Sequence, residues 1–143
     1  MYKRIIGFFI LILVSAPGFS QSIFGKWKSI DDETGEAKSI VEIYQSGEKL
    51  EGKIISLINP PPDDPDPVCS ECPKDDERYM EKVIGMVIIR DMAPDGDEFA
   101  GGTVLKPDEG RVYKCRIWLD EDQLKVRGYW GPFYRTQTWI RAN

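Results

Sequence analysis

The fold is decided by the stretch VYKCRIWLDEDQLKVRGY, which spans residues 112–129. Its first half carries apolar side chains at every second position, namely Tyr113, Cys115, Ile117 and Leu119. A period of two places such side chains on one face of a β-strand. The acidic run at 120–122 then breaks the pattern, and Gln123–Tyr129 resumes it. Two strands separated by so short a turn are predicted to pair antiparallel.

The same pattern of alternating strands and short turns continues in both directions along the chain. β-Branched and aromatic runs of six to nine residues are separated mostly by turns rich in Gly, Pro, Asp and Asn. The predicted strands are Gly25–Ile30, Ser39–Tyr44, Leu50–Ile58, Val83–Arg90, Glu98–Leu105, Val112–Leu119, Gln123–Tyr129 and Phe133–Arg141. This pattern predicts an all-β fold, namely an eight-stranded antiparallel up-and-down β-barrel, because closure leaves no open sheet edge. A two-sheet sandwich is the alternative.

Residues 59–80 interrupt the strands with six prolines and several acids. A connection of this length inside a compact domain is expected to be either functional or pinned. Cys69 and Cys72 lie within it, and we expect a local disulfide, with a redox-active pair or a metal site as alternatives. We read the acidic residues as a solvated loop rather than a calcium site, because the ligand spacing of an EF-hand is missing. Cys115 is expected to be a small buried apolar residue.

Composition excludes several functional classes. The chain has 143 residues, no His and a net charge of −5. Without His, the Ser-His-Asp and Cys-His pairs are absent, and so are helical zinc-protease motifs. The net negative charge disfavours a nucleic-acid partner. Since no cofactor fingerprint or nucleophile motif is found either, we expect a protein that is not an enzyme and that needs no cofactor and no metal.

The first twenty residues have the features of a secretory signal peptide. Lys3 and Arg4 precede an apolar run at 5–14, and small residues follow it. That run is about half as long as a membrane-spanning helix needs to be. We therefore expect residues 1–20 to be a signal peptide and 21–143 a barrel domain with no membrane span. The protein is then expected to be exported, either periplasmic or secreted.

Three motifs in fixed order carry a resemblance to a known family. They are GKW at 25–27 with DDETG at 31–35, GGTVLKPDEGRVY at 101–113, and RTQTW at 135–139. With the Cys69–Cys72 motif between them and a signal peptide ahead, the chain resembles the DUF2147 family of exported bacterial proteins of unknown function. The resemblance implies a lipocalin-like (calycin) barrel and no defined activity. This chain departs from the pattern at Lys106, where an acidic residue is expected.

Trp27 lies near the start of the first strand in a Gly-x-Trp motif similar to the structural signature of lipocalins. We expect this indole to close one end of the barrel beneath an arginine from the last strand, a cation–π contact of about 1–2 kcal/mol when desolvated. Arg135 and Arg141 lie on one face of that strand and are the two candidates.

An eight-stranded barrel is wide enough to hold one small ligand. The expected function is therefore binding of a small apolar or amphipathic molecule in the interior, which we assign to Val41, Ile43, Tyr113, Ile117, Trp118 and Tyr129. The alternative is that those residues form an ordinary filled core. In that alternative the protein is an envelope interaction module that presents aromatic side chains around its last hairpin to a protein partner.

Overall fold

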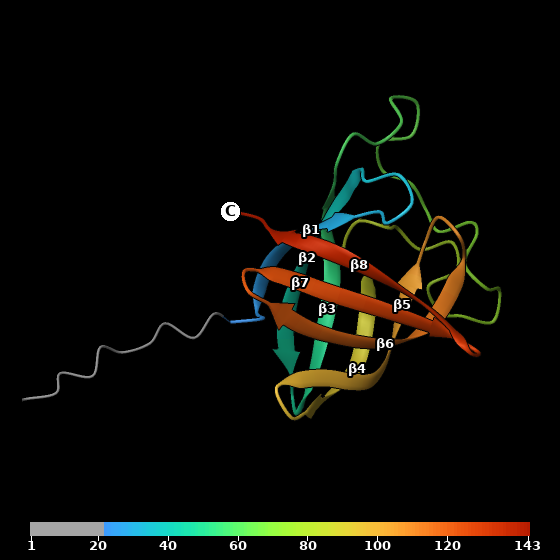
Figure 1. The fold of residues 1–143 in the computed structure, drawn as a ribbon. Coiled ribbons are helices and arrows are strands. Elements are labelled where there is room, and N and C mark those ends of the chain that lie inside the picture. Colours follow the sequence, from blue (N-terminus) through green and yellow to red (C-terminus); the bar gives the residue numbers. More distant parts are fainter. Residues whose placement is uncertain (1–21) are drawn as a thin grey trace, which may run out of the picture.

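A computed structural model of the chain describes residues 22–143. The predicted signal peptide at residues 1–20 lies outside the described residues. Eight strands follow one another without an intervening helix (Figure 1), namely β1 (Gly25–Ile30), β2 (Ala37–Ser46), β3 (Lys49–Leu57), β4 (Val87–Asp95), β5 (Glu98–Lys106), β6 (Arg111–Asp120), β7 (Gln123–Trp130) and β8 (Phe133–Arg141). In residues 22–143 there is thus no helix long and apolar enough to cross a membrane.

Each strand pairs antiparallel with the next, and β8 pairs with β1 to close the barrel. The closing contact is short: Trp27 lies opposite Arg141, and Lys28 opposite Ile140. This topology confirms the predicted eight-stranded up-and-down barrel and excludes the two-sheet sandwich.

The fourth strand was predicted too early in the chain: Val83–Arg90 was expected, and β4 spans Val87–Asp95. Val83–Met86 belong to the preceding loop, where the Val83 amide donates to the Pro67 carbonyl at 3.0 Å instead of joining a strand ladder. At its other end β4 continues through Pro94, which lies opposite Phe99 on β5. The first half of the apolar run at 83–90 lies before the strand: Val83 and Met86 are buried, and Gly85 and Met86 form single backbone hydrogen bonds with Ile54 of β3.

The antiparallel order gives the barrel two different ends. One end, here called the closed end, carries the β2–β3, β4–β5 and β6–β7 turns together with the start of β1 and the end of β8. The other, here called the mouth, carries the β1–β2 loop, the long β3–β4 connection, and the β5–β6 and β7–β8 turns. The largest fully buried side chains include Trp27, Ile43, Leu50, Ile89, Met92, Ile117 and Leu124. Most of them lie toward the closed end, so the packed core is concentrated there.

Candidate functional site: a cavity at the barrel mouth

A cavity of about 610 Å³ opens at the mouth. Its apolar wall comes from five strands and consists of Ile54, Ile88, Val104, Val126 and Trp139. Lipocalin-sized barrels leave room for one small ligand only where their inward positions are not all filled by large side chains. The question is therefore which residues leave this half of the barrel empty.

Small residues at inward positions keep the cavity open. Ser29 on β1 and Ser39 on β2 lie opposite each other and line it, as does Gly128 on β7. A Cβ atom at Gly128 would lie 3.2 Å from the Cβ of Tyr113, so even alanine would press on the neighbouring strand. The Ser29 and Ser39 hydroxyl oxygens are 2.7 Å apart, and the Ser39 amide donates to Ser29 Oγ at 3.1 Å. These buried hydroxyls are therefore satisfied by each other.

A charged cluster on the β5–β6 turn borders the cavity. Lys106 Nζ lies 2.8 Å from Glu109 Oε1 and 3.8 Å from Asp31 Oδ2. The Tyr113 hydroxyl donates to the second oxygen of Glu109 at 2.8 Å. One carboxylate thus joins a cation and a phenol beside the cavity, and the β1–β2 loop is tied to the β5–β6 turn across the mouth.

The pKa values in this cluster favour the charged forms of its ion pairs. The hydrogen bond from Lys106 lowers the pKa of Glu109, and the Thr34 amide bound to Asp31 lowers the pKa of that carboxyl. Burial opposes the charge on Lys106, yet its bond to Glu109 and the nearby carboxylates raise its pKa overall. Burial, and then the bond to Glu109, raise the pKa of Tyr113, which remains a neutral donor. The rim is therefore a fixed arrangement of paired charges.

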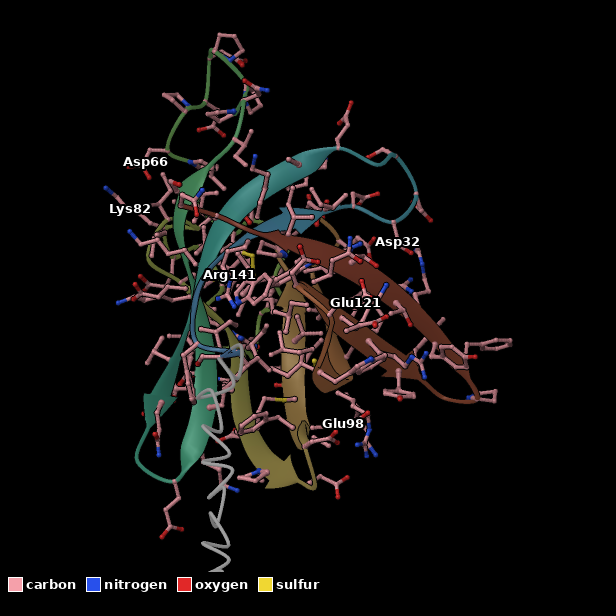
Figure 2. The ribbon with its side chains drawn as sticks, turned by 60° about the vertical axis from the view of Figure 1, so that its left-hand side comes forward. Asp32, Asp66, Lys82, Glu98, Glu121 and Arg141 are labelled. Atoms are coloured by element: carbon pink, nitrogen blue, oxygen red, sulfur yellow. A yellow bond between two sulfur atoms is a disulfide. The ribbon has the colours of Figure 1, made fainter. Side chains whose placement is uncertain are left out.

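A second network on β8 closes the other side of the mouth. Trp139 donates its indole N–H to Gln137 Oε1 at 2.8 Å, and the Gln137 amide donates to Asp32 at 3.3 Å. Arg135 forms ion pairs with Asp32 at 2.8 Å and with Glu33 at 2.9 Å. Figure 2 shows Asp32 on the β1–β2 loop beside β8. This network anchors that loop to the strand that bears the wall residue Trp139.

The long β3–β4 connection supports the mouth from outside the cavity. The predicted Cys69–Cys72 disulfide is confirmed, and both cysteines are buried. The Cys69 sulfur lies 3.7 Å from the Pro107 carbonyl oxygen. A Cβ atom at Gly110 would lie only 1.6 Å from the Glu71 carbonyl oxygen, and Gly110 has a φ of +66°. The disulfide loop therefore packs directly against the turn that carries Lys106 and Glu109.

The acidic residues of this connection are partly used as ion pairs. Arg78 is buried, and its guanidinium donates two hydrogen bonds to Asp76, at 2.8 and 2.9 Å, and a third to the Val87 carbonyl. Its hydrogen bond lowers the pKa of Asp76 to about 2. Asp66 pairs with Lys82 at 3.0 Å, and both residues are labelled in Figure 2. The loop is thus pinned by charges as well as by the disulfide. Among residues 22–143, no three His, Cys, Asp or Glu side chains gather as a metal site requires.

Only one of the six residues assigned to a ligand site lines the cavity, namely Tyr113. Val41, Ile43 and Ile117 point inward but are fully buried in the packed part of the barrel. Trp118 and Tyr129 have the opposite orientation, because the buried Ile117 and the cavity-lining Gly128 fix the alternation of their strands. Their assignment to the interior is therefore corrected to the outer face.

The two candidate arginines have different partners. The guanidinium carbon of Arg141 lies 3.9 Å from the Trp27 ring centroid, and its Nη1 donates to the Phe24 carbonyl at 2.9 Å. The Trp27 indole N–H donates to the Ile23 carbonyl, also at 2.9 Å. Arg135 is at the opposite end of β8 and belongs to the mouth network. The structure therefore selects Arg141 for the contact with Trp27 at the closed end, and Arg135 as a partner of Trp27 is corrected.

The sequence analysis missed the residues that shape the mouth. Asp31, Asp32, Lys106 and Glu109 lie in two of the motifs that carry the family resemblance, but local patterns gave no reason to assign them to a site. The signal that would have found them is topological: in an up-and-down barrel, alternate turns lie at the same end. The β1–β2 and β5–β6 turns must therefore meet on one side of the barrel.

Cys115 lies outside the cavity lining. It is buried as expected, and burial raises the pKa of its thiol to about 12. A thiol in that state is a poor nucleophile near neutral pH.

Comparison with known proteins agrees with the barrel. Residues 25–141 match the family described as "Uncharacterized protein conserved in bacteria (DUF2147)". Protein HP1028 of Helicobacter pylori, described as belonging to the lipocalin family, has a similar structure with a TM-score of 0.72. The two chains share 18% identity over 87% of this chain and 85% of that one, which supports the shared fold alone. No curated protein sequence matches significantly.

Proposed function

The chain belongs to the DUF2147 family, and from this premise we propose that its lipocalin-like barrel binds a small amphipathic ligand at the mouth. The observation that carries the proposal is the cavity of about 610 Å³ with an apolar wall and a charged rim. Small-molecule sites commonly have volumes of roughly 300–1,000 Å³ and combine apolar walls with a few placed polar groups.

The arrangement of groups suggests how such a ligand would lie. Its apolar part would contact Val104, Val126 and Trp139 and be removed from water. Its polar part would lie near the charged cluster on the β5–β6 turn, where the Lys106 ammonium has N–H donors beyond the one bound to Glu109 and the Tyr113 hydroxyl oxygen can accept a hydrogen bond. Because these side chains are already held by Glu109, little side-chain entropy would be lost when a ligand binds.

We propose binding rather than catalysis. The acids and the base at the rim are engaged with one another in ion pairs. The hydrogen bonds and charges around them lower the pKa values of Asp31 and Glu109 and raise that of Lys106, whereas acid–base catalysis needs pKa values close to neutrality. Export to the periplasm or beyond is part of the same proposal. The Cys69–Cys72 disulfide supports it, because such bonds persist mainly in oxidising compartments.

A cavity-filling variant tests the proposal. Val104→Phe places a ring in the cavity, whereas Val112→Phe adds the same ring to an exposed outer position on the neighbouring strand. The probe is 1-aminoanthracene, a small apolar dye that fluoresces when shielded from water. Wild type and Val112→Phe should enhance its fluorescence, and Val104→Phe should bind it at least about tenfold more weakly. Both variants must first give a cooperative urea transition.

The outcome also decides against the alternative function. A filled barrel that acts only through its surface would bind no dye in any of the three proteins. Equal dye binding by Val104→Phe and Val112→Phe would overturn the cavity as the site. Native mass spectrometry of the protein purified from its own host then identifies the ligand, which should be present in wild type and depleted in Val104→Phe.

A further inference from the structure

The β7–β8 hairpin exposes aromatic side chains to an unusual degree for a barrel turn. Residues 127–136, here called the hairpin tip, read RGYWGPFYRT and contain no acid. Trp130, Phe133 and Tyr134 are 62%, 70% and 59% exposed. In Figure 2 the hairpin projects beyond the rest of the barrel. Large apolar side chains grouped on a projecting tip mark an interaction site rather than core packing.

Cations accompany these rings. The Arg111 guanidinium lies 4.8 Å from the Trp130 ring centroid, and that of Arg127 lies 4.3 Å from the Tyr134 centroid. Lys114 is opposite Tyr129 on the neighbouring strand. Among residues 22–143, none of these three cations forms an ion pair, although the chain carries a net charge of −5. Three cations without a carboxylate partner in this part of the chain, two on β6 and one on β7, therefore lie beside the exposed rings, whereas Arg135 of the tip is paired with Asp32 and Glu33.

From this combination we propose that the hairpin tip docks on the surface of an anionic phospholipid bilayer. Trp and Tyr favour the membrane–water interface, and each Lys or Arg near an anionic surface adds an attraction of about 1 kcal/mol. The exposed rings of the tip and the neighbouring cations Arg111, Lys114 and Arg127 supply both terms at one place. A tip of residues 127–136 is also small for a stable protein interface, which typically uses roughly 20–30 residues on each side.

Docking at this point has a consequence for the cavity. Trp130, Phe133 and Tyr134 also line its outer edge. A bilayer that contacts them would face the mouth, so an amphipathic molecule would pass between lipid and protein without crossing bulk water. The docking itself depends only on the rings of the tip and the three cations beside them, and it holds whether or not the cavity binds a ligand.

Vesicle flotation tests the docking. The probes are vesicles of phosphatidylcholine alone and of phosphatidylcholine with phosphatidylglycerol in a 3:1 ratio, at low salt. Wild type should float with the anionic vesicles, and raised salt should weaken binding because exposed charges are screened. The double variant Trp130→Ala/Phe133→Ala should partition at least about tenfold more weakly. Phe24→Ala, which removes an exposed ring at the closed end, is the matched control and should float like wild type.

Charge is tested separately. Arg111→Gln/Arg127→Gln should lower partitioning by about fivefold for each cation removed. Lys26→Gln/Lys49→Gln removes two exposed cations at the closed end and should leave it unchanged. Val104→Phe should float like wild type, so failure of the ligand proposal would leave this one standing.

Three results would overturn the docking proposal. They are flotation that the tip variants do not reduce, equal binding to neutral and anionic vesicles, and concentration-dependent dimerisation through the tip with no vesicle binding. The last result, measured by sedimentation velocity, would assign the tip to a second copy of the chain.

Discussion

The two ends of the barrel are made from the same eight strands but from different kinds of inward side chain. At the closed end, large apolar residues such as Ile43, Met92 and Leu124 fill the interior, and Arg141 covers Trp27. At the mouth, Ser29, Ser39 and Gly128 occupy inward positions, and paired charges form the rim. The closed end thus holds most of the buried apolar side chains, and the mouth can therefore contain an open cavity.

The closed end should therefore dominate stability. Trp27→Ala removes a fully buried indole together with its cation–π and hydrogen-bond partners. We expect the free energy of unfolding, measured by urea denaturation, to fall by about 3–5 kcal/mol. Phe24→Ala removes an exposed ring nearby and should change it by less than about 0.5 kcal/mol. If the two variants were equally stable, the closed end would not carry the stability assigned to it.

The largest effect at the mouth should come from the contact between its turn and the disulfide loop. In Gly110→Ala, alanine would have to adopt a left-handed backbone conformation, and its Cβ would clash with the Glu71 carbonyl oxygen. We expect a loss of about 2–4 kcal/mol in urea unfolding. Gly96→Ala is the control, because Gly96 has nearly the same φ, +65°, with open space around it. It should lose only about 1–2 kcal/mol. A matching loss at both glycines would mean that the loop does not press on the turn.

Acid should weaken the mouth through the buried pair in its supporting loop. Asp76 and Arg78 are only 10% and 7% exposed, and the pKa of Asp76 is lowered to about 2. A lowered folded-state pKa contributes stability above the unfolded-state value, and that contribution is lost as the pH falls through about 2. The stability difference between wild type and Asp76→Asn, measured from pH 5 to pH 2, should shrink by about 2 kcal/mol. Asp75→Asn, at the exposed neighbouring position, is the control, and its stability difference from wild type should not shrink in this way. If the difference for Asp76→Asn stayed constant from pH 5 to pH 2, the pair would not be the source of the acid sensitivity.

The smallest contrast is between the two arginines of β8. Arg141→Gln at the closed end loses a cation–π contact and a charged hydrogen bond, so we expect a cost of about 1–2 kcal/mol. Arg135→Gln at the mouth loses ion pairs to Asp32 and Glu33 that are largely exposed, so we expect about 0.2–1 kcal/mol. Thermal melts of both variants under the same buffer check the order. If Arg135→Gln lowered the melting temperature more than Arg141→Gln, the network at the mouth would contribute more to stability than the contact with Trp27.

Local patterns were sufficient for most of the fold. Period-two alternation and short polar turns located seven of the eight strands to within a few residues, because each pattern depends only on neighbouring positions. The exception, β4, shows the limit of this reasoning. Val83 and Met86 are buried in the segment before the strand, and no local signal separates that burial from burial in a strand.

The sequence by itself determined the barrel, the local disulfide and the presence of an arginine over Trp27, since alternation, proximity and residue type set each of these. Only the tertiary structure decided which arginine, which turns meet at the mouth, and where the interior is empty. Strand register fixes these features, because a shift of one residue exchanges inward and outward side chains. Trp118 and Tyr129 were assigned inward, and the register places both on the outer face. The volume left beside Ser29, Ser39 and Gly128 likewise exists only once all eight strands enclose it.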